Sequence, residues 1–315
     1  MACRLTRSLN TLPSQVALAV GTFDGVHLGH QALLNAMIDF SASHNRCASV
    51  LTFSAPPNGF LHPASDPGRL MDNCSLVHTL RGMISNGLLI QQTFNAAFAS
   101  IPAPVFAASL QHAVIFCGED WRFGMGAEGS PRLLQALGFD VHIIPYAQWQ
   151  GTRISSSRIR SALRQGKFDE AAAMLGRPWQ FSGRVEHGRG LAGTLFGVPT
   201  LNIPYHGRSD ERMAPLAHGV YLANARVQRL NTSTPTYWPA LVNFGTAPSI
   251  KQIHSPLFEV HLIGASGDFY DAQVELSFNT PRLRPEQHFS SLVELKQQIL
   301  KDLAIAQEWF TAHGH

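Results

Sequence analysis

The sequence predicts two domains of different class: an α/β domain with a doubly wound parallel sheet, then an all-β barrel or sandwich. Three observations lead to this prediction. At 315 residues the chain is long enough for about two domains. Its first half alternates apolar runs with helical patterns, as βαβ units do. Its second half consists of short alternating runs separated by glycine, proline and asparagine, a pattern typical of antiparallel sheets.

The first half is expected to place its ligands at the carboxyl ends of its parallel strands. The predicted strands are Val16–Val20, Cys47–Phe53, Ala113–Cys117 and Asp140–Pro145. The predicted helices are Ala32–Phe40, Leu76–Asn86, Pro104–Leu110, Ser130–Leu137, Ser157–Arg164 and Phe168–Leu175. Ser156 is a candidate N-cap. The segment Phe60–Asn73, rich in proline, glycine and aspartate, is expected to be irregular.

Gly176-Arg177-Pro178 interrupts the helical pattern and marks the expected boundary, which gives domains of 1–176 and 177–315. The predicted strands of the second domain are Phe181–Val185, Gly219–Val227, Trp238–Phe244, Leu257–Ile263 and Gln273–Phe278. One amphipathic helix closes the chain, capped by Ser290 or Ser291. Its expected buried face consists of Leu292, Leu295, Ile299, Leu303, Ala306 and Phe310.

The composition predicts a globular protein of the cytoplasm. The net charge of +3 is spread along the chain without a Lys/Arg run, which argues against nucleic acid as a partner. Four scattered cysteines without a CxxC pair argue against a zinc site or a disulfide framework and fit a reducing compartment. The sequence shows neither a signal-peptide pattern nor an apolar run of about 20 residues, so no membrane association is expected.

The first candidate site is the glycine-rich turn Gly21-Thr22-Phe23-Asp24-Gly25-Val26-His27-Leu28-Gly29-His30, which lies between a strand and a helix. A helix start offers unpaired N–H groups and a partial positive charge, which suit a phosphate. The imidazoles of His27 and His30 can stabilise negative charge that develops on a leaving pyrophosphate. A glycine-rich turn with two surface histidines is the structural alternative, and the context favours phosphate binding.

Two further segments of the first half carry polar groups. Ile154–Arg160 combines three serines at a helix start with two arginines, which predicts a second anion site or an ordinary capped, basic helix. Gly118–Gly124 follows a strand and could hold a planar ring, or could be a plain junction with a buried tryptophan.

The segment Gly188–Gly193 matches the dinucleotide fingerprint G-x-G-x-x-G, but that fingerprint requires a following helix. The next residues end in Gly197-Val198-Pro199 and cannot open one, so the NAD interpretation is rejected. A glycine-rich phosphate loop between strands remains possible. No Walker A sequence occurs in the chain.

Two strand segments of the second half carry candidate catalytic groups. In Pro199-Thr200-Leu201-Asn202, Thr200 and Asn202 point to one face, and their hard oxygens can ligate Mg²⁺. In Phe258-Glu259-Val260-His261-Leu262, Glu259 lies opposite the apolar face and can serve as a general base. A strand with one solvated polar face explains either segment when it is taken alone.

Taken together, these motifs resemble the bacterial bifunctional riboflavin kinase/FAD synthetases (FMN adenylyltransferases), over roughly Gln15 to Phe310. Gly21–His30, Gly118–Gly124 and Ile154–Arg160 resemble the three adenylyltransferase motifs, and Pro199–Asn202 resembles the kinase Pro-Thr-Ala-Asn signature. Asn243-Phe244-Gly245, Phe269-Tyr270 and Arg284–Phe289 are also similar to the family. The resemblance implies an N-terminal doubly wound nucleotidyltransferase (Rossmann-like) domain and a C-terminal six-stranded barrel.

The resemblance also implies two reactions. The C-terminal domain would convert riboflavin and ATP to FMN, and the N-terminal domain would convert FMN and ATP to FAD and pyrophosphate. Mg²⁺ is the implied cofactor, and riboflavin, FMN, FAD and ATP are the implied ligands. The oligomeric state is left open.

The resemblance assigns site residues in both domains. The adenylyltransferase set for ATP is Gly21, Phe23, Asp24, Gly25, His27, His30, Gly118, Asp120, Ser155, Ser156, Ser157 and Arg160. The kinase set for ATP is Gly188, Gly193, Gly197, Pro199, Thr200 and Asn202, with Mg²⁺ on Thr200 and Asn202. The catalytic residues are Glu259, His27 and His30, and Arg284 and Glu286 lie on the flavin side.

The chain departs from the family pattern at two places. Ser54-Ala55-Pro56-Pro57 stands where the family has Glu-Pro-His-Pro, and Thr194 stands where the kinase loop has a basic residue. Two alternatives to the bifunctional enzyme are therefore kept: a riboflavin kinase with an impaired adenylyltransferase, and a flavin-nucleotide sensor without turnover.

Overall fold

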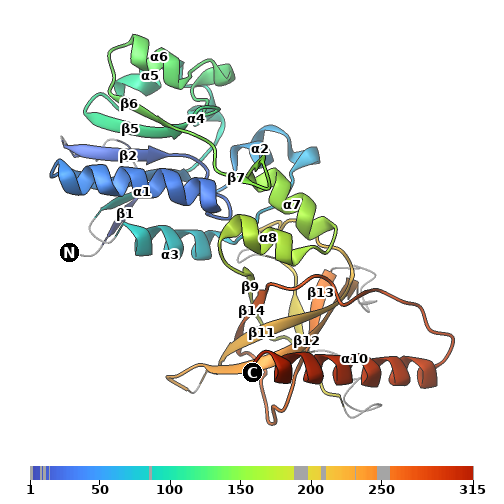
Figure 1. Cartoon of the computed structure of the whole chain (residues 1–315). Coiled ribbons are helices and arrows are strands. Elements are labelled where there is room, and N and C mark those ends of the chain that lie inside the picture. Colours follow the sequence, from blue (N-terminus) through green and yellow to red (C-terminus); the bar gives the residue numbers. More distant parts are fainter. Residues whose placement is uncertain are drawn as a thin grey trace. The chain divides into compact units, whose positions relative to one another are not determined.

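A computed structural model describes residues 3–7, 9, 12–13, 15–84, 87–187, 198–206, 211–230, 232–246 and 256–314. The chain divides into two compact units, Met1–Arg158 and Ile159–His315 (Figure 1). The boundary predicted from the sequence, at residue 176, stays a prediction. None of the helices in the described part of the chain combines the length and hydrophobicity of a membrane span.

Unit 1, Met1–Arg158, is built on a six-stranded sheet in which every pairing is parallel, with the order β1-β4-β3-β2-β5-β6. Its strands are β1 (Arg4–Thr6), β2 (Val16–Val20), β3 (Cys47–Phe53), β4 (Leu88–Gln92), β5 (Ala113–Gly118) and β6 (Val141–Ile144). The strand order reverses between β2 and β5, and ligands of open α/β sheets bind at such a switch point. The predicted doubly wound sheet is confirmed.

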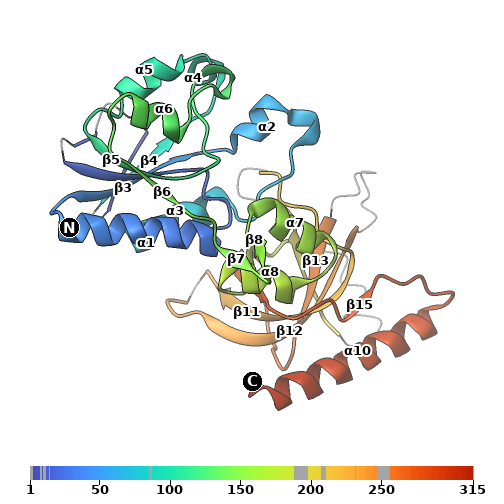
Figure 2. The same cartoon turned by 45° about the horizontal axis from the view of Figure 1, so that its top comes forward.

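Helices cover both faces of this sheet because alternate residues of β2 point to opposite sides (Figures 1 and 2). Ala17 and Ala19 pack in the cluster that α1 and α3 enter, and Leu18 packs in the cluster of α5 and α6. The helices of the unit are α1 (Leu28–Ser43), α2 (Pro57–Leu61), α3 (Asn73–Met83), α4 (Ala96–Ala99), α5 (Ala103–Ala108) and α6 (Pro131–Ala136), with short 3₁₀ turns at Pro63–Ser65 and Met125–Ala127.

Several sequence-based boundaries need correction. The first helix begins at Leu28 rather than Ala32, because His27 caps it. The segment Phe60–Asn73, predicted to be irregular, carries the end of α2 and a 3₁₀ turn. Strand β4 went unrecognised, because a buried parallel strand is a continuous apolar run without alternation.

The β-hairpin of β7 (Gln148–Trp149) and β8 (Thr152–Arg153) was likewise not predicted. It leads into α7 (Ser156–Arg164), within which the boundary between the two units falls. The cap of α7 is Ser155 rather than Ser156, because the Ser155 hydroxyl accepts a hydrogen bond from the Arg158 N–H at 3.2 Å.

Unit 2, Ile159–His315, is an antiparallel sheet with the path β10-β13-β12-β11-β14-β9, to which β15 adds alongside β11. The strands are β9 (Trp179–Arg184), β10 (Leu201–Pro204), β11 (Gly219–Gln228), β12 (Thr236–Thr246), β13 (Pro256–Leu262), β14 (Gln273–Phe278) and β15 (Arg284–Pro285). A bridge between Glu186 and Asn202 joins the two ends of the path, so the sheet curls onto itself. The predicted all-β barrel domain followed by a helix is confirmed as a curled antiparallel sheet, in which six strands form the path and β15 is a seventh.

The interior of the barrel is filled by aromatic side chains, among them Phe244, Phe258 and Phe278, which are at most 2% exposed. Helix α8 (Phe168–Leu175) adds to this core, since the Phe168 ring contacts Trp179 and Tyr221. The outer face carries the polar residues of the second candidate site.

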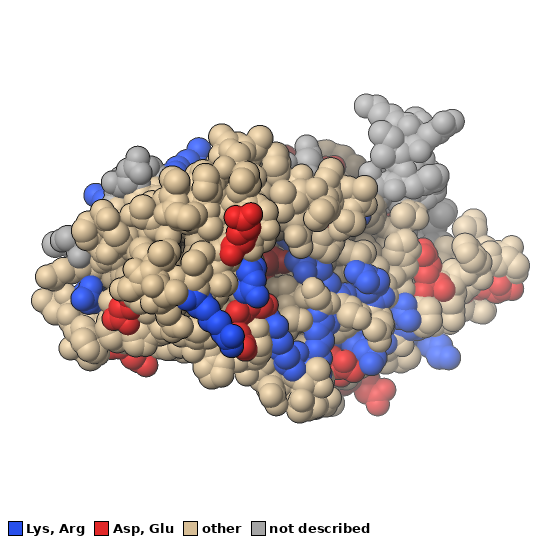
Figure 3. All heavy atoms as spheres, turned by 90° about the horizontal axis from the view of Figure 1, so that it is seen from above, with Lys and Arg blue, Asp and Glu red and all other residues tan. Residues whose placement is uncertain are grey.

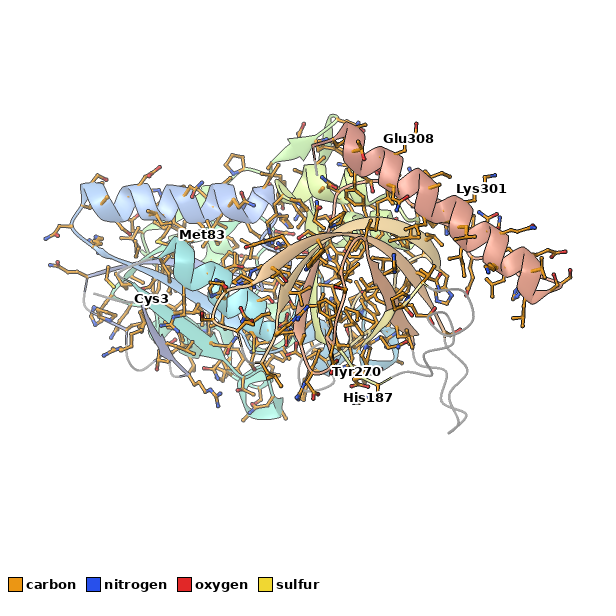
Figure 4. The ribbon with its side chains drawn as sticks, turned by 90° about the horizontal axis from the view of Figure 1, so that it is seen from below. Cys3, Met83, His187, Tyr270, Lys301 and Glu308 are labelled. Carbon is orange, nitrogen blue, oxygen red and sulfur yellow. The ribbon has the colours of Figure 1, made fainter. Side chains whose placement is uncertain are left out.

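The final helix, α10 (Leu292–Ala312), packs on this outer face mainly through its C-terminal half (Figure 2). Ala306 and Phe310 are buried as predicted, and Ser291 is the cap. Leu292 was assigned to the buried face, but it is 60% exposed because α10 meets the cluster around β11 and β12 only farther along. Lys301 and Glu308 point away from the barrel (Figure 4).

Candidate active sites

The turn after β2 has an unusual backbone that its buried side chains hold in place. Phe23, Gly25 and Val26 all have positive φ, at 51°, 81° and 42°. A left-handed conformation is costly for valine, and it persists only where the surroundings fix it. Phe23 is fully buried and Val26 is 1% exposed, so two hydrophobic side chains anchor the turn in the core.

Hydrogen bonds within unit 1 fix the carbonyl groups of this turn. The Thr52 hydroxyl donates to the Thr22 carbonyl at 3.1 Å, and the Ser156 hydroxyl donates to the Asp24 carbonyl at 3.0 Å. The Gln31 amide donates to the Val26 carbonyl at 2.9 Å. The carbonyls thus face protein donors, and the Ser156 contact joins the first and third motifs across 132 residues of sequence.

His27 and His30 form a stacked pair at the start of α1. Their ring centroids lie 3.6 Å apart at 15°, and His27 Nδ1 accepts the His30 backbone N–H at 3.2 Å. That bond fixes the tautomer of a neutral His27, whose proton is then on Nε2. Among the described residues, the N–H groups of Leu28 and Gly29 have no protein acceptor, as expected for a helix start that receives an anion.

His30 is held in its neutral form. Burial, together with the neighbouring His27, holds the pKa of His30 well below its usual range. Its Nδ1 is buried and has no hydrogen-bond partner among the described residues. A buried polar atom without a partner is costly in free energy, and a ligand atom can offset that cost.

Several other residues assigned to the adenylyltransferase have protein partners of their own. The Asp24 carboxylate accepts the Leu70 N–H at 3.0 and 3.2 Å, which fastens the segment before α3 to the glycine turn. Ser155 and Ser156 make the contacts already described, and Ser157 is exposed. Arg160 is buried.

Arg158, which was paired with Arg160 in the sequence interpretation, binds the hairpin instead. Its guanidinium donates to the carbonyls of Trp149 and Thr152 at 3.0 and 2.8 Å. The same group lies over the Trp149 ring. Arg158 therefore orders the segment that precedes α7.

Gly118 and Asp120 lie at the carboxyl end of β5, beside the switch point. The Asp120 carboxylate pairs with Arg153 at the surface, and the Arg153 guanidinium stacks on Tyr146. Trp121 packs against Phe123, with ring centroids 4.7 Å apart, and both contact Phe106.

A chain of aromatic rings continues from Phe106 along this edge of the sheet. Phe98 contacts Phe106, and Phe94 connects Phe98 to Phe60, a residue that is 47% exposed. Phe53, the last residue of β3, contacts Phe94 and Phe98. The rings lie next to Ser54–Pro57, and Arg69 donates a hydrogen bond to the Ser54 carbonyl there. This surface can accept a planar, apolar ring.

In unit 2, the strand register brings three polar residues into one row. Asn202 of β10 lies directly opposite Glu259 of β13, and Glu259 lies directly opposite Asn243 of β12. Directly opposite residues share one face of a sheet. The Asn243 amide donates to Glu259 Oε2 at 3.0 Å.

Thr200 precedes β10 and is half-buried. The His261 ring, two residues after Glu259, makes a hydrogen bond of 2.9 Å with the Pro199 carbonyl. Asn202 therefore shares a face with Glu259, Thr200 lies two residues before Asn202, and all three side chains carry oxygen atoms. Gly188, Gly193 and Gly197 lie outside the described residues. The rings of His187 and Tyr270 stack just before that segment, 3.9 Å apart (Figure 4).

Arg284 is committed to a partner that the sequence interpretation missed. Its Nε and Nη2 donate to the Asp302 carboxylate at 2.7–3.1 Å, and Asp302 is 3% exposed. Gln298 also donates to Asp302, at 2.7 Å. One acidic residue on the apolar face of the last helix was the available signal, and it predicts a buried partner of opposite charge.

Glu286 lies near the row of polar residues. Its Oε2 is 3.2 Å from His218 Nδ1, and its Oε1 lies so close to Gly245 that a β-carbon there would be 2.8 Å away. Gly245 follows Asn243 on the same face of β12. The sequence analysis named Asn243 only as part of a segment similar to the family and did not name His218, since only the strand pairing reveals their neighbours.

The comparisons with known proteins cover both units. A family model described as FAD synthetase matches residues 9–158, and one described as riboflavin kinase matches residues 175–310. A bifunctional riboflavin kinase/FMN adenylyltransferase from Pseudomonas fluorescens is 31% identical, with 99% of each chain covered. Its counterpart from Escherichia coli K12 is 34% identical, with 93% of this chain and 92% of the other covered.

Among solved structures, one described as a macrolide-efflux protein from Streptococcus pneumoniae matches with a TM-score of 0.81 and 25% identity. The match covers 98% of this chain and all of the other.

Proposed function

The chain belongs to the family of bifunctional riboflavin kinases/FMN adenylyltransferases, and on this premise we propose how its residues divide the two reactions. The family makes FMN from riboflavin and ATP, and FAD from FMN and ATP. We assign adenylyl transfer to the glycine turn of unit 1 and phosphoryl transfer to the outer face of the barrel in unit 2.

The observation that carries the first assignment is the His27/His30 pair at the start of α1. Attack by an FMN phosphate oxygen on the α-phosphorus of ATP forms one P–O bond and releases pyrophosphate. Negative charge grows on the bridging and leaving oxygens, and N–H donors at a helix start stabilise it. His27 Nε2 and the Leu28 and Gly29 amides supply these donors. The hydrogen bonds that the carbonyls of the turn accept keep the donors in place.

We place the flavin ring of FMN on the aromatic edge that ends at Phe60. A run of rings offers stacking area in place of the polar Glu-Pro-His-Pro segment that this chain lacks. Asp120, Ser155, Ser157 and Arg160 remain our candidates for the ATP side of this site.

The observation that carries the second assignment is the row Asn202–Glu259–Asn243. Glu259 takes the proton of the ribityl hydroxyl. The hydroxyl oxygen attacks the γ-phosphorus of ATP at the same time, and ADP leaves. Thr200 and Asn202 would hold Mg²⁺, which neutralises the phosphate charge. Their hard oxygens fit this ion, which commonly takes few protein ligands and completes its shell with phosphates and water.

The sequence also leads us to propose small molecules as the partners and a reducing, cytoplasmic compartment. Cys3, Cys47, Cys74 and Cys117 are all free thiols, which fits that compartment. Lys and Arg side chains are interspersed with Asp and Glu on the face shown in Figure 3.

The test incubates pure protein with riboflavin, ATP and Mg²⁺ and separates FMN from FAD by chromatography. We expect both products. Glu259→Gln should lower FMN formation by about 100-fold or more and leave FAD formation from supplied FMN unchanged, and His30→Ala should do the reverse.

Other outcomes would refute the assignment. FMN without FAD would indicate a lone kinase, and bound flavin without either product would indicate a sensor. Equal loss of both activities in either variant would refute the division into two sites.

A further inference from the structure

Glu259 lies between two amide side chains on neighbouring strands. Asn202 faces it from β10 and Asn243 faces it from β12, each in direct register. The amide of Asn243 donates a hydrogen bond to the carboxylate, to Oε2 at 3.0 Å. The amide nitrogen must be the atom that faces Glu259, because an ionised carboxylate only accepts hydrogen bonds.

Within the described part of the chain, no Lys, Arg or His pairs with the Glu259 carboxylate, and Asn243 is its one hydrogen-bond donor. The charged or titratable residues near it in the strand pattern include His261, Glu286 and His218. Arg284 lies farther along the same row, opposite Val220 of β11, and donates to Asp302. His261 binds the Pro199 carbonyl, and His218 pairs with Glu286. One neutral amide donor orients the carboxylate and leaves its other oxygen available to accept a proton.

Asn243 is placed rigidly enough to fix another side chain. Strand β12 is paired on both sides, with β11 through Val220 and with β13 through Glu259. Its neighbours Val242 and Phe244 are buried on the opposite face at 0% and 2% exposure. The strand therefore cannot shift without disturbing the barrel interior.

We propose that Asn243 is the positioning residue of the kinase base: its amide holds Glu259 Oε2, so that Oε1 is presented to the hydroxyl of riboflavin. This inference rests on the proposed role of Glu259. General base catalysis requires the accepting oxygen to be within hydrogen-bond reach of the proton, and a free glutamate side chain samples several rotamers. Asn243 removes that freedom without touching the substrate.

Two substitutions test the role. Asn243→Ala removes the donor and the side chain, and Asn243→Asp keeps the shape but replaces the donor by an acceptor. Both should lower kcat for FMN formation by about 10- to 100-fold while KM for riboflavin and ATP changes by less than about threefold. Asn224→Ala is the matched control, since Asn224 lies on the adjacent strand β11 on the same face. It should leave kcat within about twofold.

The decisive measurement combines Asn243→Ala with Glu259→Gln. A positioning residue acts through the base, so the second substitution should change the residual rate of Glu259→Gln by less than about twofold. FAD formation from supplied FMN, measured on the same samples, reports whether each variant is intact.

Three results would overturn the proposal. Unchanged kcat in both single variants would show that Glu259 needs no such contact. If Asn243→Ala lowers kcat by the same factor in the wild type and in Glu259→Gln, Asn243 has only a structural role. A rise in KM alone would show that Asn243 contacts substrate. Failure of the proposed function is distinguishable, because Glu259→Gln itself would then keep full activity.

Discussion

The ion pair between Arg284 and Asp302 predicts that the stability of unit 2 depends on one buried contact. The side chains are 15% and 4% exposed, and the guanidinium donates through Nε and Nη2. Removing one partner of a buried pair costs about 3–5 kcal/mol, because the other charge stays buried without compensation. In a unit of this size, 1 kcal/mol corresponds to about 2–4 °C. Asp302→Ala should therefore lower the Tm of unit 2 by about 6–20 °C.

The assay heats the protein and measures both activities afterwards. FMN formation should be lost at a lower temperature in Asp302→Ala, while FAD formation from FMN should survive to the temperature of the wild type. The double variant Arg284→Met/Asp302→Leu should regain most of the lost stability, since apolar pairs of similar volume replace buried ion pairs at little cost.

The same variants test whether Arg284 contributes to flavin binding. If Arg284 only anchors α10, the double variant should keep the KM for riboflavin of the wild type. A stable double variant with a KM raised tenfold would support the flavin contact implied by the family. A Tm shift below about 1 °C in Asp302→Ala would refute the reasoning from burial.

Three further predictions concern the two sites. Gly29→Ala would bring a β-carbon within 3.2 Å of the His27 ring, so FAD formation should fall at least about tenfold while FMN formation stays unchanged. The control is Gly82→Ala, where a β-carbon meets nothing within 4 Å. Because the folded-state pKa of His30 is depressed, the stability of unit 1 should be full above the ordinary histidine value near 6.5 and should fall as the pH drops below it. Chemical denaturation at pH 7.5 and 5.0 should show this fall, and His30→Asn should reduce it. Removing Mg²⁺ with a chelator should abolish FMN formation, and added Mg²⁺ should restore it; persistence of the activity in chelator would contradict the assignment to Thr200 and Asn202.

Local pattern was enough for most elements and for the face on which each site residue lies. The alternation in β13 correctly put Glu259 opposite Phe258 and Val260. The turn after β2 was also found, because three glycines and two histidines between an apolar strand and a helix are typical of a turn that approaches a phosphate closely.

Contacts between distant segments could not be predicted in the same way. The sequence around Asp24 indicates a phosphate turn, but the carboxylate holds the Leu70 amide, 46 residues away. In the same way, Asp302 on the apolar face of α10 indicates a buried partner, but nothing in the sequence identifies Arg284 as that partner. Asp24 and Arg284 both carry charge in a motif, and sequence alone does not say whether such a charge faces a ligand or a buried partner.

Strand β13 has consequences for how this protein can vary. Phe258, Val260 and Leu262 fill the barrel, and Glu259 and His261 face the polar row, so neighbouring positions serve either packing or chemistry. Deleting one residue at the start of β13 would move each later side chain of this strand to the opposite face. Glu259 would then be buried, and Phe258, Val260 and Leu262 would be exposed. Such a variant would lose both the packing of the barrel interior and the catalytic base. Changes of length in this half of the protein should therefore be confined to its loops.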